Sequence, residues 1–361
     1  MSSPTTLVTP EVRALVGRKN AWWEPPEPVT RSEVRRFAEA TLNPGPLHLD
    51  EGYAARSRWG GVVAPPTYVI RPPYGGIAIH GPSARTFRVD IPGAPRGVNA
   101  GNEVEVFRPV RVGDIVRQRT RLAEVQEKTG RSGPFVLIVV ETVYVDGQGE
   151  VLALARQEHI RLPPREGGEE RRQPAEGPLP ASSVRDGRHA PDVRYGARPL
   201  AFDEVEVGTE LPPNAYGPVT SEMVVRFSAA VENYEALHHD FLWCREHGFP
   251  NVLINGPLKQ GLLGTYLAQL AGEEGFVRRL RASHRGMDFP GYELTVRGVV
   301  THKEVGPDGL GSVELDVWVE NQAGERTCPG SATLVLPRAG GPPVPTAFPC
   351  PRERVAWAFE P

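Results

Sequence analysis

Hydrophobic residues recur at helical spacing in two stretches of the C-terminal half of the chain. In residues 221–231 the apolar side chains lie three or four positions apart, which predicts a short amphipathic helix capped by Thr220 or Ser221. In residues 258–272 they cover a broad face, and Pro257 stands at the first turn, where its missing N–H leaves no helical hydrogen bond unmade. The second stretch predicts a long, buried helix.

Beyond these helices the pattern changes to the alternating or β-branched runs that are typical of strands. Strands are predicted at residues 292–302, 312–321 and 325–336 of the C-terminal half, and at 102–107, 113–125, 134–144 and 151–161 of the N-terminal half. The N-terminal half has no uninterrupted helical stretch before its strands, because four prolines permit at most two turns there. These prolines are Pro65, Pro66, Pro72 and Pro73. The central helix of the first half is therefore expected to be lost or shortened.

A long internal repeat relates the two halves. Residues 28–50 read PVTRSEVRRFAEATLNPGPLHLD and residues 218–240 read PVTSEMVVRFSAAVENYEALHHD, with eleven identical positions and no gap. Asn43 and His48 of the first copy correspond to Asn233 and His238 of the second. A repeat of this length indicates one supersecondary unit that is used twice, so each half is expected to have the same fold.

Composition divides the chain between these repeats. Residues 164–200 are charged, rich in Pro and Gly and almost free of large apolar side chains, which predicts a linker without a core of its own. The predicted organisation is an N-terminal unit at 1–163, the linker, a C-terminal unit at 201–337 and a Pro-rich tail at 338–361. The apolar end of the tail is expected to dock on the body of the protein.

Charge and cysteine content exclude several classes of function. The net charge is -3, with 41 basic and 44 acidic residues interspersed, so no basic surface for nucleic acid or an anionic membrane is expected. No apolar run reaches the roughly 20 residues that span a bilayer, and the first residues do not form a secretory signal, which predicts a cytoplasmic protein. Cys244, Cys328 and Cys350 are scattered, which argues against a metal site or a disulfide framework.

A long helix wrapped by an antiparallel sheet, with a polar loop at its N-terminus, is the hot-dog arrangement. Two such units in tandem predict an α+β double hot-dog fold. Several short motifs of the C-terminal half stand out: Phe227-Ser228-Ala229, Asn233, Leu237-His238, Asp240, Gly256-Pro257-Leu258 and Ser283-His284-Arg285-Gly286. Through these positions it resembles the MaoC-like acyl dehydratases of the (R)-specific enoyl-CoA hydratase superfamily, especially the mesaconyl-CoA hydratase and 3-hydroxyacyl-thioester dehydratase branch. The N-terminal half resembles the dehydratase N-terminal domain through AEATLNPGPLHLD, GGVVAPPT and FRPVRVGD.

This resemblance implies a hydro-lyase that interconverts a 2-enoyl thioester and its 3-hydroxyacyl thioester. Such a reaction needs a base for water, an acid for the α-carbon and donors for the enolate oxygen. The resemblance assigns proton transfer to His238 and the oxyanion donor to the backbone N–H of Gly256, at a helix N-terminus. Asn233 stands where the hydratases carry an Asp; since an amide cannot act as a base, its expected role is to orient water or the imidazole. The alternatives are an Asx-turn at Asn233 and plain helix capping at Gly256.

Further residues receive supporting roles. Asp240 and Asn255 are expected to support the imidazole and the helix N-terminus, and Arg285 and Lys259 are candidates for the phosphates of coenzyme A. Asn43 and His48 are interpreted as a vestigial copy, because the first half lacks an obvious oxyanion donor. One active site is therefore predicted, in the second half.

The expected partner is an acyl-CoA or acyl carrier protein thioester, with no separate cofactor and no metal, and the chain is expected to form a homo-oligomer, as a dimer. Two other functions fit the same residues. A hot-dog acyl-CoA thioesterase is one, although such enzymes usually carry a carboxylate where this chain has Asn233. A non-catalytic acyl-CoA-binding partner subunit of a hydratase complex is the other.

Overall fold

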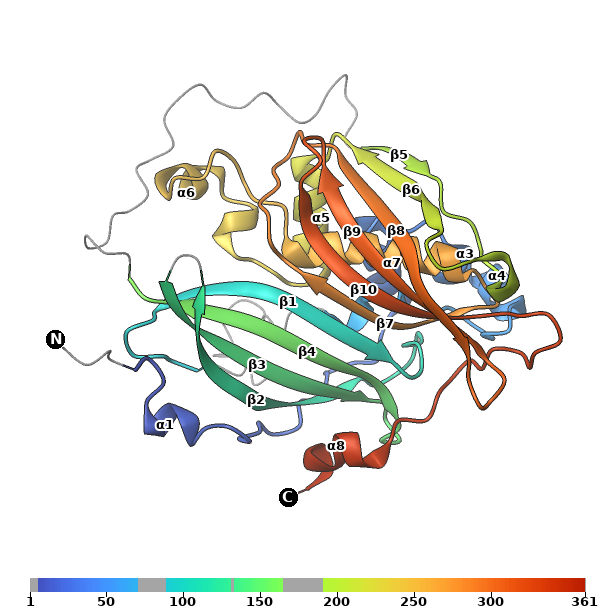
Figure 1. The fold of residues 1–361 in the computed structure, drawn as a ribbon, viewed down its shortest axis with the longest axis horizontal. Helices are drawn as coiled ribbons and strands as arrows, with labels where there is room; N and C mark the ends of the chain where they lie inside the picture. Colours follow the sequence, from blue (N-terminus) through green and yellow to red (C-terminus); the bar gives the residue numbers. More distant parts are fainter. Residues whose placement is uncertain (1–5, 71–88, 131–132, 165–190, 361) are drawn as a thin grey trace.

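The computed structural model describes residues 6–70, 89–130, 133–164 and 191–360. Their strands form a single antiparallel sheet of ten, in the order β2-β3-β4-β1-β7-β10-β9-β8-β6-β5 (Figure 1). The first half contributes β1 (Arg96–Val106), β2 (Arg117–Gly130), β3 (Gly133–Val145) and β4 (Val151–Leu162). The second half contributes β5 (Asp192–Tyr195), β6 (Glu210–Gly217), β7 (Phe276–Ser283), β8 (Leu294–Val305), β9 (Gly311–Asn321) and β10 (Arg326–Leu336). All seven predicted strands are present.

The two halves meet where β1 pairs with β7. This pairing runs antiparallel from Gly101 opposite Ser283 to Glu105 opposite Arg279. Oppositely charged side chains flank it: Arg278 lies 3.0 Å from Glu105, and Arg279 lies 3.8 Å from Glu103. Strand β7 was not predicted, because its run of arginines hides the alternation that normally reveals a strand.

The predicted central helix of the second half is confirmed as α7 (Gly256–Ala271). It is buried along most of its length and packs against β7, β8, β9 and β10 (Figure 1). Helix α5 (Ser221–Ala230) precedes it, and Thr220 Oγ1 accepts a hydrogen bond from the Met223 N–H at 3.2 Å, as expected of an N-cap. Between them lie the short helices η4 (Ala236–His238) and α6 (Phe241–Glu246).

The helices of the first half follow the repeat up to the position of the central helix. They are α1 (Pro10–Arg13), α2 (Arg31–Ala40), α3 (Pro46–Leu49), α4 (Glu51–Arg56) and η1 (Tyr68–Ile70). Helix α2 corresponds to α5, and the two pack together with the rings of Phe37 and Phe227 6.2 Å apart. Where the second half has α7, the described residues of the first half contain one 3₁₀ turn, η1; residues 71–88, which include Pro72 and Pro73, lie outside the described residues.

The predicted linker extends too far at its C-terminal end. Residues 165–190 lie outside the described residues, but β5 pairs with β6, and Ala197 is buried. The Leu200 N–H donates a hydrogen bond of 2.8 Å to the carbonyl oxygen of Leu270, at the end of α7. Residues 191–200 therefore belong to the second half, in contrast to the boundary predicted from composition.

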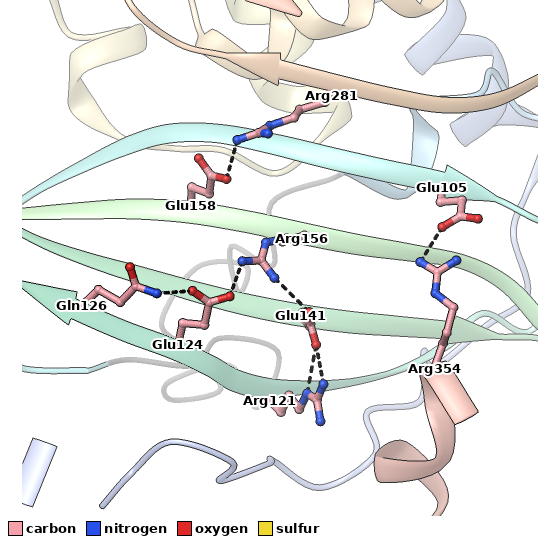
Figure 2. A network of polar contacts seen from close by, with 9 residues as sticks. All are labelled: Glu105, Arg121, Glu124, Gln126, Glu141, Arg156, Glu158, Arg281 and Arg354. Atoms are coloured by element: carbon pink, nitrogen blue, oxygen red, sulfur yellow. Dashed lines mark hydrogen bonds and ion pairs between the residues drawn. The ribbon is translucent and has the colours of Figure 1, made fainter. Parts of the chain in front are cut away.

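The tail docks on the first half of the sheet, as predicted from its apolar end. Helix α8 (Arg352–Phe359) buries Val355 and Ala358 against Val143 and Val145 of β3. Arg354 forms a 2.6 Å ion pair with Glu105, near the β1–β7 junction (Figure 2).

Ion pairs also join strands β2, β3 and β4 of the first half. Arg156 of β4 bonds to Glu124 of β2 and, at 3.2 Å, to Glu141 of β3 (Figure 2). Glu141 in turn pairs with Arg121 of β2 at 2.7 Å. A separate ion pair joins the two halves of the sheet: Arg281 extends from β7 to Glu158 of β4 at 2.9 Å (Figure 2).

Candidate active site

The polar loop after α5 has the same backbone course as the loop after α2. Glu232 and Leu42, which are 190 positions apart, both adopt positive φ values, of 58° and 51°. In each loop the following asparagine closes an Asx-turn: Asn233 Oδ1 accepts from the Glu235 N–H at 3.3 Å, and Asn43 Oδ1 accepts from the Gly45 N–H at 2.9 Å. The Asx-turn expected as the structural alternative for Asn233 is therefore present, and its Oδ1 is already engaged.

Each loop ends on a buried histidine that is held in one orientation. His238 Nδ1 lies 2.8 Å from the carbonyl oxygen of Leu253, and His48 Nδ1 lies 2.7 Å from that of Val63. A carbonyl only accepts hydrogen bonds, so Nδ1 carries the proton in both rings and Nε2 keeps its lone pair. Burial lowers the pKa of His238 below its usual value and lowers that of His48 to about 4. Both imidazoles are therefore neutral bases at neutral pH.

The N-terminus of α7 follows closely on this arrangement in the second half. Leu253, which holds His238, precedes Gly256 by three residues, a chain length that spans at most about 10 Å. The Gly256 N–H has no acceptor within the described part of the chain. Asn255 is fully buried, donates weakly to Ser228 Oγ at 3.4 Å, and keeps its Oδ1 without a partner there. The residue that holds the His238 base thus leads directly into a helix N-terminus with a free N–H and an unpaired amide oxygen.

A cavity of about 310 Å³ opens between the two halves of the protein, beside His48. Its lining includes Asn43 and His48 of the loop, Val106 of β1, and Phe276 and Val277 of β7. His238 does not line it. The two equivalent loops therefore differ in their surroundings: the first borders a cavity, and the second borders a helix N-terminus.

Comparison with known proteins relates the chain to dehydratases. Residues 14–155 match the family model described as the FAS1-like dehydratase domain region. The chain is 32% identical over 112 residues to a UPF0336 protein from Thermobifida fusca, a match that covers 30% of this chain and 70% of that protein. It is 26% identical over 176 residues to mesaconyl-C(4)-CoA hydratase from Chloroflexus aurantiacus, covering 47% of this chain and half of that enzyme. With 3-hydroxybutyryl-CoA dehydratase from Methylorubrum extorquens it shares 29% identity over 141 residues, 39% of this chain and 83% of that enzyme.

Solved structures show the same fold over nearly the whole chain. A MaoC-like dehydratase superposes with a TM-score of 0.67 at 21% identity, covering 91% of this chain and 99% of that one. A protein from Mycobacterium tuberculosis that is described as having a double hotdog fold gives a TM-score of 0.56 at 19% identity, covering 88% and 96%. The chain belongs to the MaoC-like hot-dog dehydratase family. The predicted α+β double hot-dog fold is confirmed.

The contacts of two predicted site residues of this MaoC-like protein, Lys259 and Asp240, differ from those that their predicted roles require. Lys259 is not available to the phosphates of coenzyme A: its Nζ is buried, pairs with Asp288 at 2.8 Å and donates to the Gly286 carbonyl oxygen at 2.8 Å. Arg285 is exposed and remains a candidate. Asp240 accepts from the Trp243 N–H at 2.9 Å, which makes it the N-cap of α6. Its contacts therefore support the loop after His238 and not the imidazole itself.

The sequence did not reveal the contribution of His284 to this MaoC-like site. A β-carbon on Gly256 would lie 2.6 Å from the His284 ring, so the first residue of α7 must be a glycine while the ring occupies that place. Asn102 of β1 donates to His284 Nε2 at 3.2 Å and to Gln260 Oε1 at 3.2 Å. Burial, assisted by the charge of Lys259, lowers the pKa of His284 to about 3, so it is a neutral acceptor. The first half thereby reaches the N-terminus of α7.

No metal centre or membrane-spanning element is found in the described ranges. No group of three His, Cys, Asp or Glu side chains there could hold a metal ion, and none of the described helices is long and apolar enough to cross a bilayer. The three cysteines are free thiols; Cys244 and Cys328 are buried, and Cys350 is half-buried.

Proposed function

We propose that the protein is a hydro-lyase that interconverts a 2-enoyl thioester and its 3-hydroxyacyl thioester. One observation carries the proposal: the carbonyl oxygen of Leu253, three residues before Gly256, fixes the proton of His238 on Nδ1, which leaves Nε2 as a base. The hydratase and dehydratase names of two relatives support the same reaction class.

The chemistry follows from these groups. In the hydration direction His238 Nε2 takes a proton from water while the water oxygen bonds to the β-carbon, and the electrons of the double bond move onto the thioester oxygen. The Gly256 N–H and the positive end of the α7 dipole stabilise the resulting enolate. The protonated His238 then donates that proton to the α-carbon, which restores the thioester. The Oδ1 of Asn233 is held in the Asx-turn, so its Nδ2 is the group that directs the water.

The proposed substrate is a coenzyme A thioester, as the relatives' names suggest, or the equivalent thioester on an acyl carrier protein. Arg285, which is exposed next to His284, is the remaining candidate for its phosphates. Thioester hydrolysis and a purely binding role are the two competing functions. They separate in one assay: hydration lowers the ultraviolet absorbance of the enoyl thioester without releasing thiol, hydrolysis releases thiol, and a binding protein does neither.

The matched variants for the proposed base are His238→Asn and His239→Asn. An asparagine at 238 can still donate to the Leu253 carbonyl but has no group in place of Nε2. We expect His238→Asn to lower turnover at this centre by roughly 10²- to 10⁴-fold, the usual contribution of a general base. His239, which is exposed, should tolerate the same change. Equal rates for the two variants, measured in a chain that also carries His48→Asn so that the first loop cannot contribute, would remove His238 from the mechanism.

A further inference from the structure

The cavity beside His48 has the size and lining of a ligand site. Its volume of about 310 Å³ is at the lower end of the range for small-molecule pockets. Its apolar walls come from both halves: Val63 and Val106 from the first, and Phe276 and Val277 from the second. An acyl chain of a few carbons is the kind of ligand that such walls accommodate.

An unpaired hydrogen-bond donor lies in the cavity wall. Asn43 is 3% exposed; the Gly45 N–H uses its Oδ1, but its Nδ2 has no partner in the described structure. A buried amide donor left unpaired costs about 1–3 kcal/mol. An oxygen atom of a bound ligand would satisfy it. His48 lies in the same wall with its Nδ1 on Val63, so the free Nε2 is the second polar group available to that ligand.

The charges around the cavity favour a neutral ligand oxygen over a carboxylate. The guanidinium of Arg108, which also lines the cavity, is already bound by Asp114 at 3.1 Å and by Asp146 at 2.9 Å. The other wall carries Glu273, whose Oε2 accepts from the Tyr53 hydroxyl at 2.5 Å. No unmatched positive charge therefore awaits an anion among these lining residues. A thioester carbonyl fits the Asn43 amide better than a free fatty acid does.

We infer that the first half holds a second reaction centre, in which Asn43 Nδ2 binds the thioester carbonyl oxygen and His48 Nε2 is the base. The inference rests on the reaction proposed for this chain but not on His238. The atoms balance as in the second half: His48 takes a proton from water as its oxygen bonds to the β-carbon, Asn43 stabilises the enolate oxygen, and the proton returns to the α-carbon. The interpretation of Asn43 and His48 as vestigial depended on a missing helix N-terminus. The Asn43 amide supplies the donor that this helix would have provided.

Kinetics of the full chain test the second centre. His48→Asn keeps a donor for the Val63 carbonyl and removes Nε2, as His238→Asn does in the other loop. With enoyl-CoAs of increasing chain length, each single variant should retain turnover from the intact centre, and the double variant should lose roughly 10²- to 10⁴-fold relative to wild type. If His238→Asn alone shows the full loss for every chain length while His48→Asn keeps wild-type kcat and KM, the second centre is refuted.

Equilibrium binding separates this inference from the proposed function. A saturated acyl-CoA such as butyryl-CoA cannot be hydrated, so calorimetry reports sites without turnover. Wild type should bind two per chain. Ala268→Leu, which adds bulk to the cavity wall, should leave one, whereas Ala229→Leu on the exposed face of α5 should leave two. A stoichiometry of one that Ala268→Leu does not change overturns the inference, and two bound ligands without hydration in wild type overturn the chemistry at both centres.

Discussion

Gly261 of α7 packs directly against Thr41 of the first half, so closely that a β-carbon on the glycine would lie 2.5 Å from Thr41 Cγ2. One turn further, Thr265 Oγ1 donates to the Thr41 carbonyl oxygen at 2.9 Å. The same crowding recurs at Gly264, whose added β-carbon would meet Thr67 at 2.6 Å. The two halves are thus held together through the central helix as well as through the sheet.

This contact reverses the usual effect of Gly→Ala in a helix. In an open helix the change stabilises by about 0.5–1 kcal/mol, and we expect that gain for Gly52→Ala in α4, where only flexible side-chain ends lie near. Gly261→Ala should instead destabilise by about 1–3 kcal/mol through overpacking. Urea unfolding measures both. The pair Gly261→Ala with Thr41→Ser, which removes the obstructing methyl, should recover stability; no recovery would locate the strain elsewhere.

The buried ion pair of Lys259 and Asp288 predicts a large loss when either partner is removed. Asp288 also accepts from Thr327 Oγ1 at 2.6 Å, so its carboxylate is fully committed inside the protein. Lys259→Met leaves this charge buried and unpaired, which should lower the free energy of unfolding by about 3–5 kcal/mol. Breaking the exposed pair of Arg226 with Glu222 should change it by less than about 0.5 kcal/mol. Similar losses for the two pairs would contradict the buried geometry.

Burial of His48 predicts a pH dependence of stability. Its pKa is about 4 in the folded protein against 6.5 for the free side chain, so the unfolded chain binds more protons between these values. Stability should therefore fall as the pH drops from 6.5 to 4, by on the order of 3 kcal/mol from this residue. His48→Asn should show a weaker loss over that window than His302→Asn, which alters an exposed histidine. Parallel pH profiles for the two variants would show that His48 is not the titrating group.

The lowered pKa of His238 predicts where activity is lost in acid. The imidazole acts as a base only when neutral, and burial keeps it neutral below the usual pKa of 6.5. The acid limb of kcat/KM for enoyl thioester hydration should thus have its midpoint below pH 6.5. A midpoint above that value would indicate a protonated or differently buried histidine.

Much of the fold could be predicted, because helical spacing in 221–231 and 258–272 and alternation in seven strands are local signals. The repeat added that the two halves share one fold. Strand β7 escaped because its arginines are satisfied by glutamates of β1, which are remote in the sequence. Strand β5 escaped because its four residues lie within a polar, Pro-rich stretch.

The candidate site was predictable only as far as the repeat reaches. The pairing of each loop histidine with a carbonyl fifteen residues later could not be predicted, since it depends on how the chain returns. Lys259 looked like a phosphate ligand because its partner Asp288 lies 29 residues away. The cavity beside His48 involves β7 and the end of α7, which the sequence did not place near the first loop.

The charges along the β1–β7 junction are complementary, with acidic side chains on one strand and basic side chains on the other. Glu103 and Glu105 line β1, and Arg278 and Arg279 face them from β7. Two first halves that met through β1 would bring glutamate against glutamate, and two second halves would oppose arginines, so each edge rejects a copy of itself. In a symmetric dimer every substitution appears twice. Here the two loops lie on one chain, so a substitution in the loop of His238 leaves the loop of His48 unchanged, and the two loop sequences can vary independently.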